Sequence, residues 1–363
     1  MSYHGQKRPV APQRQADAKE WDTNKDGYLS EREILKGNGV DFRKKETAGE
    51  DRPGLVHETK CWLAGEPNEY RDSYHSYAEV GKELKSLEKK YPKLAKRVSL
   101  GKSVEGREIW ALRLREKPGQ DKVVITGLHH AREWMTVEIP LGMAKEFCER
   151  PEGLNGKEVW LVPLVNPDGY EYSRETDNMW RKNRQPLESG EVGVDLNRNY
   201  WDGKEATRHI YRPKGDRPNT TKDDFEEGND DPKAENYRGP KGGSEPETQA
   251  LMKLKLDSVG SLDFHSYGQM ILHPPGHTFK RQKGEAAMAR IGEAMNQAAG
   301  GELKVSRGTG LYPTSGSPDD LLFHYGIPSF TFEVNGCFQP HPSLIEPTVE
   351  KMNKAAVAFL KEV

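Results

Sequence analysis

Two kinds of apolar pattern alternate along this 363-residue chain from about residue 74 onward. Short β-branched runs, such as Val123 to Ile125, are followed by amphipathic stretches, such as Met135 to Cys148. Strands that alternate with helices predict an α/β fold, in which a mixed sheet carries helices on both faces. The expected helices span residues 77–91, 135–148, 245–258, 285–299 and 344–363, and the expected strands span residues 97–100, 108–114, 123–127, 158–165, 261–264 and 329–332.

The first 65 residues lack this alternation and contain a different signal, a loop at 22–33 that fits the EF-hand pattern. Gly27 stands where such a loop turns sharply, and Leu29 stands where it packs an apolar side chain. The spacing predicts a bound Ca²⁺, with a polar turn between two helices as the alternative. The expected ligands are Asp22, Asn24, Asp26, Tyr28 through its carbonyl, Ser30 through water, and Glu33 through both carboxylate oxygens.

These patterns predict two units in the chain. An EF-hand-like, helical calcium-binding segment with its linker is expected over residues 1–65, and a larger domain over residues 66–363. EF-hands usually occur in pairs, and the sequence shows one such loop. We therefore expect this segment to pack against a partner, either the larger domain or another chain.

Charge and hydropathy exclude several classes of function. The 55 basic and 57 acidic residues leave a net charge of −2, which gives no electrostatic reason to bind nucleic acid or a membrane surface. The longest apolar runs fall far short of the roughly 20 residues of a membrane span. The first residues lack the apolar core of a secretion signal, although such a signal could have been removed.

A polar insertion and three cysteines are more easily explained by structure than by a role in catalysis or metal binding. Residues 201–245 form a long polar insertion with an acidic run, which we interpret as a solvated loop, with a second calcium site as the less favoured alternative. Cys61, Cys148 and Cys337 are widely spaced and form no CxxC pair. Free or buried thiols are expected, and at most one internal disulfide could form.

The strongest candidate chemistry lies where apolar strands end. His130 follows the strand at 123–127, and Glu133 comes three residues later at the mouth of a helix, so both side chains can point at one place. His265 follows another apolar strand. Two imidazoles and one carboxylate suit a catalytic Zn²⁺ and leave one position for water. Taken alone, each of these residues is more often a structural or solvated side chain.

Glu333 ends the strand at 329–332, which is too apolar to expose a charge without a reason. A carboxylate beside water activated by zinc can accept a proton and then pass it to a leaving amine. The alternative is a salt bridge at the end of the strand.

The region from about Tyr74 to the C-terminus resembles the carboxypeptidase A/B family of zinc metallocarboxypeptidases. The resemblance implies an eight-stranded mixed sheet with helices on both faces, a catalytic Zn²⁺, and hydrolysis of the C-terminal peptide bond of peptides and proteins. It rests on motifs in the family's order: Glu105-Gly-Arg107, Gly127-Leu-His-His-Ala-Arg-Glu-Trp134, Asn166-Pro-Asp-Gly169, Trp180-Arg-Lys182, Val194-Asp-Leu-Asn-Arg-Asn199, His265-Ser-Tyr267, Leu311-Tyr312 and Phe330-Thr-Phe-Glu333.

The resemblance also implies a role for each matching residue. A planar, permanently charged guanidinium suits the recognition of a terminal carboxylate, because it donates two parallel hydrogen bonds. Ordinary surface ion pairs are the alternative for Arg181 and Arg198, and His129 receives no role. By resemblance, His130, Glu133 and His265 hold the zinc, Glu333 is the general acid/base, Arg181 stabilises the oxyanion, Asn197 and Arg198 bind the terminal carboxylate, Tyr312 closes over it, and Arg132 lines a subsite.

Asp319 is the residue from which we expect side-chain specificity. It resembles the position at the base of the family's side-chain pocket, where an apolar residue marks the A type and an aspartate the B type. The resemblance therefore implies a preference for C-terminal Lys or Arg, through charge pairing in a partly desolvated pocket.

Two other functions stay open at this stage. A peptidoglycan-peptide carboxypeptidase or other amidohydrolase would use the same fold, although Asn197, Arg198 and Tyr312 argue against it. A non-enzymatic, calcium-dependent binding module would need a decayed site, whereas no ligand or acid/base residue is missing here. A calcium loop joined to a secreted type of peptidase favours a location outside the cytoplasm, either secreted or periplasmic.

Overall fold

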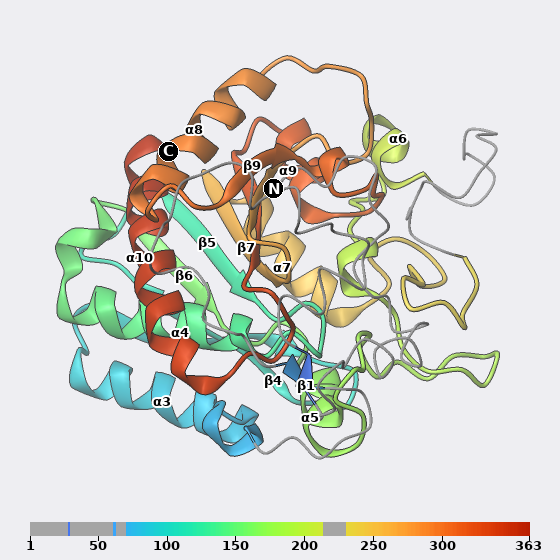
Figure 1. The fold of residues 1–363 in the computed structure, drawn as a ribbon, viewed down its shortest axis with the longest axis horizontal. Helices are drawn as coiled ribbons and strands as arrows, with labels where there is room; N and C mark the ends of the chain where they lie inside the picture. Colours follow the sequence, from blue (N-terminus) through green and yellow to red (C-terminus); the bar gives the residue numbers. More distant parts are fainter. Residues whose placement is uncertain (1–27, 30–60, 63–69, 213–229) are drawn as a thin grey trace, which may run out of the picture.

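The computed structural model describes residues 28–29, 61–62, 70–212 and 230–363. The larger domain is built on one eight-stranded mixed sheet, as predicted, with the strand order β3-β4-β6-β5-β7-β10-β8-β9 (Figure 1). The strands are β3 (Ala95–Lys102), β4 (Glu108–Leu114), β5 (Lys122–Gly127), β6 (Glu158–Val162), β7 (Gly260–Ser266), β8 (Met270–His273), β9 (Lys304–Arg307) and β10 (Ser329–Val334).

The centre of the sheet is parallel, whereas antiparallel pairs lie toward both sides. Strands β6, β5, β7 and β10 run in the same direction. The pairs β3/β4, β4/β6 and β8/β10 are antiparallel, and β9 is parallel to β8. The carboxyl ends of β5, β7 and β10 therefore lie at one edge of the sheet, which is where ligands gather in sheets of this kind.

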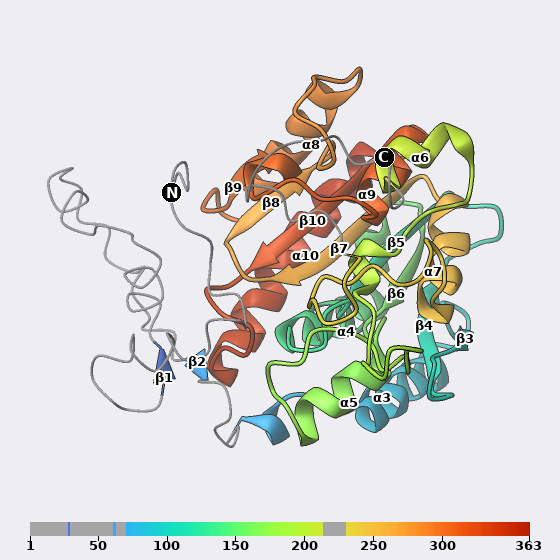
Figure 2. The same cartoon turned by 90° about the vertical axis from the view of Figure 1, so that its right-hand side faces the viewer.

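Helices cover both faces of the sheet, and each face has its own apolar core (Figures 1 and 2). Phe147, Ile291 and Phe359 belong to the larger core, and Leu251 and Leu321 belong to the smaller one. Helices α3 (Tyr77–Lys90), α4 (Met135–Glu149), α8 (Glu285–Ala298) and α10 (Ile345–Glu362) contribute to the first core, and α7 (Pro246–Leu256) and α9 (Pro318–His324) contribute to the second.

The differences from the predicted elements have local causes. The strand expected to reach residue 165 ends at Val162, because Pro163 has no N–H to donate to a neighbouring strand. Strands β8 and β9 were not predicted, since four residues are too few to show a period. Helix α5 (Pro167–Glu175) was also missed, although Asn166 caps it by accepting a hydrogen bond from Gly169.

The interpretation of residues 201–245 as a solvated loop is wrong for the parts that the structure describes. Helix α6 (Arg208–Tyr211) buries Tyr211, whose ring stacks on Trp201 with 5.2 Å between centroids. Arg238 is also buried, donates to the carbonyl of Tyr211 at 2.7 Å, and lies 3.0 Å from Asp230. This part of the insertion therefore packs onto the domain, while residues 213–229 lie outside the described residues.

The predicted calcium loop lies outside the described residues, apart from Tyr28 and Leu29. These two residues form β1 (Tyr28–Leu29), which pairs in antiparallel fashion with β2 (Cys61–Trp62). Calcium binding and the division at residue 65 stay predictions. Calcium titration of the chain and of an Asp22→Ala variant tests the first, and equal affinities would contradict it.

Two further expectations concern cysteines and membranes. The expectation of free thiols holds for Cys148, which is buried, and is wrong for Cys337, which is disulfide-bonded. In the part of the chain that the structure describes, no helix is both long and apolar enough to cross a membrane.

An ion pair beneath α3 predicts a pH-dependent part of the stability. His75 Nδ1 lies 2.7 Å from Glu138 Oε2, and this contact raises the pKa of His75 above 6.5. Because the pKa is raised on folding, the protonated His75 stabilises the fold. This contribution to the free energy of unfolding is complete below about pH 6.5 and is lost as pH rises through the folded-state pKa. We expect His75→Gln to lower Tm at about pH 6 and to have a smaller effect at about pH 9.

Thermal unfolding across this pH range measures the effect. His341→Gln is the matched control, because His341 is exposed and its Nδ1 contacts only the nearby Ser343. An equal loss of Tm at both pH values for His75→Gln would contradict the assignment.

Candidate metal centre and active site

A turn after β5 brings His130 and Glu133 together. Leu128 adopts a left-handed backbone conformation with φ of 56°, and its N–H donates to Thr136 Oγ1 at 2.9 Å. The N–H of Glu133 then donates to the carbonyl of His130 at 3.1 Å. The chain thus folds back within one turn before α4 begins, and both side chains face the carboxyl edge of the sheet.

Strand register places His265 and Glu333 side by side. They are paired positions on the parallel strands β7 and β10, and Gly127 at the end of β5 pairs with Phe264. Paired positions on parallel strands point their side chains to the same face. The sheet therefore brings the third candidate ligand and the candidate acid/base to one place, from positions 68 residues apart in the sequence.

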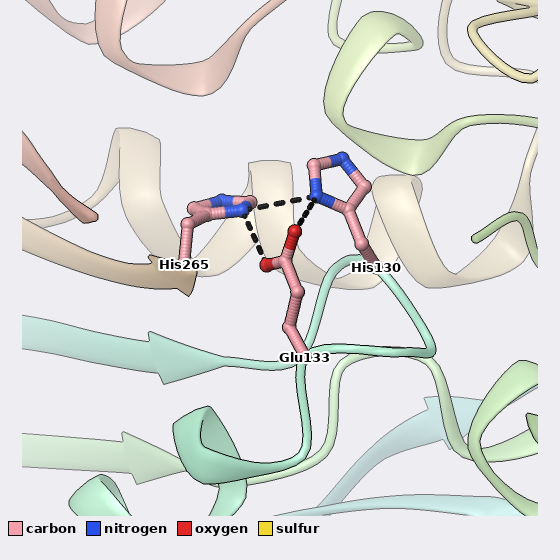
Figure 3. Close-up of side chains that lie close together, drawn as sticks. All are labelled: His130, Glu133 and His265. Carbon is pink, nitrogen blue, oxygen red and sulfur yellow. Dashed lines mark hydrogen bonds and ion pairs between the residues drawn. The ribbon is translucent and has the colours of Figure 1, made fainter. Parts of the chain in front are cut away.

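His130, Glu133 and His265 converge at this place and are buried (Figure 3). The Nδ1 atoms of the two histidines lie 3.2 Å apart, and they lie 2.7 and 3.0 Å from the two carboxylate oxygens of Glu133. Among the described residues, this is the only group of three or more His, Cys, Asp or Glu side chains whose possible ligand atoms all lie within 4.8 Å of one another.

The charges of this group fit a divalent cation. Burial opposes ionisation of Glu133, yet the two histidines hold the pKa of its carboxyl well below the ordinary value. Burial lowers the pKa of His130, whereas Glu133 outweighs burial at His265 and raises its pKa. Two ring nitrogens that face each other beside a carboxylate offer lone pairs to one point. These three side chains would hold a divalent cation such as Zn²⁺, whose charge would offset that of the carboxylate.

Asp195 orients this centre and was not singled out from the sequence. Its buried carboxylate lies 3.2 Å from His130 Nε2 and accepts hydrogen bonds from Arg181 Nε and Nη2 at 3.0 and 2.8 Å. Burial opposes its ionisation, but Arg181 and His130 keep its pKa well below the ordinary value. A carboxylate on the far nitrogen fixes which nitrogen of His130 faces the metal. The available signal was its place between Val194 and Asn197 in a quoted motif.

We expect Asp195→Asn to weaken zinc binding by about 10–100-fold, because the substitution removes the charge that orients His130. Competition with a chelator at constant pH measures the affinity. Asp257→Asn is the control, since Asp257 is exposed and its ion pair among the described residues is with Lys122. Unchanged zinc affinity in Asp195→Asn would contradict this role.

His129, the neighbour of the candidate ligand, lies outside the converging group. Its Nε2 lies 2.8 Å from the hydroxyl of Tyr200, and its ring stacks on His265 with 5.3 Å between centroids. Burial lowers its pKa well below the ordinary value, so the ring is neutral. His129 therefore packs beneath a candidate ligand and restricts how that ring turns.

A cleft opens beside the candidate metal centre and is lined in part by His130. Arg181 and Arg132 are not among the residues that line it: Arg181 is held by Asp195, and Arg132 lies 3.2 Å from Glu235 Oε2 with its guanidinium 4.4 Å from the Phe338 ring centre. The sequence-predicted residues that line the cleft are His130, Asn197, Arg198, Tyr312, Asp319 and Glu333.

A basic and an acidic side chain line this cleft, and each has a polar atom without a hydrogen-bond partner. Arg198 is 2% exposed, its guanidinium lies 5.9 Å from the ring centre of Tyr312, and its Nε has no hydrogen-bond partner. Asp319 Oδ2 accepts from Thr331 at 2.6 Å, whereas its buried Oδ1 has no partner. Buried polar atoms without partners are costly, so both positions suit a ligand with a carboxylate and a cation.

The fold and this site define a class of protein. Residues 80–355 match the zinc carboxypeptidase family, and the chain belongs to that family. It is a hydrolase, specifically a zinc-dependent metallocarboxypeptidase, so the non-enzymatic binding module is excluded.

Named relatives agree with this membership. The chain is 29% identical to carboxypeptidase O of Homo sapiens over 322 residues, which cover 80% of this chain and 79% of the relative. It is 31% identical to a zinc carboxypeptidase of Simulium vittatum, over 80% of this chain and 96% of that protein.

Solved structures show the same similarity. Bovine thrombin-activatable fibrinolysis inhibitor, in complex with tick carboxypeptidase inhibitor, superposes with a TM-score of 0.69 at 26% identity, covering 80% of this chain and 98% of that one. Carboxypeptidase A from Helicoverpa armigera superposes with a TM-score of 0.68 at 25% identity, covering 80% of this chain and 74% of that one.

Proposed function

We propose that this zinc carboxypeptidase releases C-terminal Lys and Arg from peptides and proteins. The observation that carries the proposal is the pair of unused buried atoms in one cleft, Arg198 Nε and Asp319 Oδ1. A C-terminal basic residue supplies a partner for both, because it carries a terminal carboxylate and a cationic side chain.

Recognition of the chain end is assigned to Asn197, Arg198 and Tyr312. Arg198 donates one hydrogen bond to the carbonyl of Asn197 at 2.7 Å, which fixes the guanidinium and leaves Nε free. A fixed guanidinium binds a carboxylate through charge-assisted hydrogen bonds. Tyr312 lines the same cleft and is assigned to close over the bound carboxylate. Arg132, which does not line the cleft, is assigned to a subsite for the rest of the peptide.

The hydrolytic step is assigned to Glu333 and Arg181, with His130, Glu133 and His265 as the residues that would hold zinc. When bound there, zinc supplies Lewis-acid activation of water and of the scissile carbonyl. Glu333 accepts the proton of the attacking water and passes it to the leaving amine. Arg181, held in place by Asp195, stabilises the charge that develops on the carbonyl oxygen.

Burial supports Glu333 as the acid/base. It raises the pKa of Glu333 to about 8 in the absence of a bound metal, and His265 and Arg181 oppose the rise. A carboxyl with a pKa near the working pH can both accept and return a proton. Glu333 also lines the cleft beside His130, where a scissile bond would lie.

Paired peptides that differ only at the chain end test the proposed function. The zinc-loaded protein should release Arg from a peptide with a free C-terminal carboxylate and leave the C-terminal amide of the same peptide intact. A chelator should abolish the release and added zinc should restore it. Cleavage of the amidated peptide at a similar rate would contradict an exopeptidase that binds the terminal carboxylate.

We also propose a location outside the cytoplasm. The disulfide at Cys337 supports it, because such bonds persist in oxidising compartments. Fractionation of producing cells tests it, and enzyme found only in the cytosolic fraction would contradict it.

A further inference from the structure

Three histidines gather away from the candidate active site. His209 lies on α6, His277 on the loop between β8 and α8, and His324 at the end of α9. The ring centre of His209 lies 5.6 Å from that of His277 and 5.9 Å from that of His324. None of the three lines the substrate cleft. Figures 1 and 2 both place α6 beside α9, so three separate segments bring these rings together.

The ring spacing fits shared binding of one metal ion. With zinc–nitrogen bonds of about 2.0–2.1 Å, each imidazole centre lies about 3.2 Å from the ion, so two rings at tetrahedral angles have centres about 5 Å apart. The two observed spacings exceed this value by less than 1 Å. The rings are steeply inclined, at 68° and 61°, rather than stacked face to face.

Two of the rings have a polar neighbour: His209 makes a hydrogen bond, and His277 lies beside a carboxylate without a hydrogen bond to it. His277 is 4% exposed, and its Nδ1 lies 3.2 Å from Asp320 Oδ1. His209 has a hydrogen bond with the backbone of Ala206. A carboxylate or backbone carbonyl on one ring nitrogen is the usual outer partner of a histidine whose other nitrogen binds a metal.

The charge state of the central ring agrees with this arrangement. Burial lowers the pKa of His209, and His277 and His324 lower it further. The neutral imidazole is the form that binds a metal, so His209 needs little proton release when an ion arrives.

We propose that His209, His277 and His324 form a second metal site, which takes Zn²⁺ and is separate from the catalytic centre. Among the described residues, only the catalytic group already brings its ligand atoms within 4.8 Å of one another. The second site therefore closes when the exposed rings of His209 and His324 turn toward His277, which stays in place beside Asp320.

The site would brace one wall of the substrate cleft. Gly276, which precedes His277, and Asp320 both line the cleft, and the N–H of Gly276 donates to Asp320 Oδ1 at 2.7 Å. An ion bound by His277 and His324 would tie this wall to α9 and, through His209, to the insertion. It would stabilise the folded protein by an amount that rises with the logarithm of the zinc concentration once that concentration exceeds the Kd.

Calorimetric titration with zinc chloride tests the site in protein that already holds one equivalent of zinc. We expect the wild-type protein to bind one further equivalent. His209→Ala and His324→Ala should each weaken this second binding by at least tenfold, and neither should then gain Tm at the zinc concentration that raises Tm of the wild type. The two exposed histidines are chosen because their removal leaves no cavity in a core.

His341→Ala, another exposed histidine, is the matched control and should keep the second equivalent. The proposal is overturned if the wild type binds only one equivalent in total. It is equally overturned if either cluster variant keeps the second equivalent with unchanged affinity, or if the control loses it.

Discussion

Replacing Glu333 with Gln is expected to lower kcat by roughly 10²–10⁴-fold on a C-terminal Arg peptide, the usual contribution of a positioned acid/base. Gln keeps the size of the side chain and the packing of β10, but it cannot accept the proton of the attacking water. KM should change little, because the terminal carboxylate and the basic side chain contact Arg198 and Asp319 instead. Steady-state kinetics on the zinc-loaded variant measure both quantities.

Two controls separate this chemical role from a structural one. Zinc content should equal that of the wild type loaded in the same way, since Glu333 is not in the converging group of ligands. Glu346→Gln, an exposed substitution at the start of α10, should leave kcat unchanged. A Glu333→Gln variant with the zinc content of the wild type and more than a tenth of its kcat would contradict the acid/base assignment.

The second large effect is expected from Asp319→Asn. Asn keeps an oxygen that can accept from Thr331 and removes the charge that would face the substrate's cation. We expect kcat/KM on C-terminal Arg or Lys peptides to fall on the order of 100-fold, the scale of losing one partner of a buried charge pair. Activity on Leu or Phe peptides should be spared, because these side chains place no charge beside the carboxylate.

Equal losses on basic and apolar peptides would show that Asp319 serves the fold rather than specificity. Asp320→Asn is not a suitable control, because the Asp320 carboxylate accepts from Gly276 and lies beside His277. Glu346→Gln again serves as the control, since Glu346 is exposed and does not line the cleft.

The same residue predicts a pH dependence of specificity. Burial, together with the nearby Asp263, raises the pKa of Asp319 to about 7. The carboxyl is charged above this pKa and neutral below it, so the preference for Arg over Leu should weaken as pH falls through about 7. The ratio of kcat/KM for the two peptides across this range measures it, and the Asn variant should show a flat ratio.

Local spacing, taken together with the family resemblance, predicted which side chains converge in the candidate metal centre. His130 and Glu133 lie within one turn, and His265 and Glu333 end strands whose apolar character is plain in the sequence. The sheet then needs only parallel order to bring those strand ends together. The long helices and strands were predicted within a few residues of their observed bounds, because their apolar patterns are local and strong.

What the sequence could not show depends on contacts between distant segments. Asp195 lies 65 residues from His130 in the chain, and only the folded turn at 195–198 places its carboxylate on that ring. The burial of Arg238 depends on two carbonyls at the end of α6, which no periodicity reveals. Hydrophobic patterning reports which face of an element is buried, but not which polar groups meet there.

Crystals of the protein loaded with one equivalent of zinc, measured at the zinc absorption edge, test the central claim most directly. We expect an anomalous peak about 2.0–2.2 Å from His130 Nδ1, His265 Nδ1 and a carboxylate oxygen of Glu133. Zinc bound elsewhere, with these three side chains still paired only with one another, would contradict it.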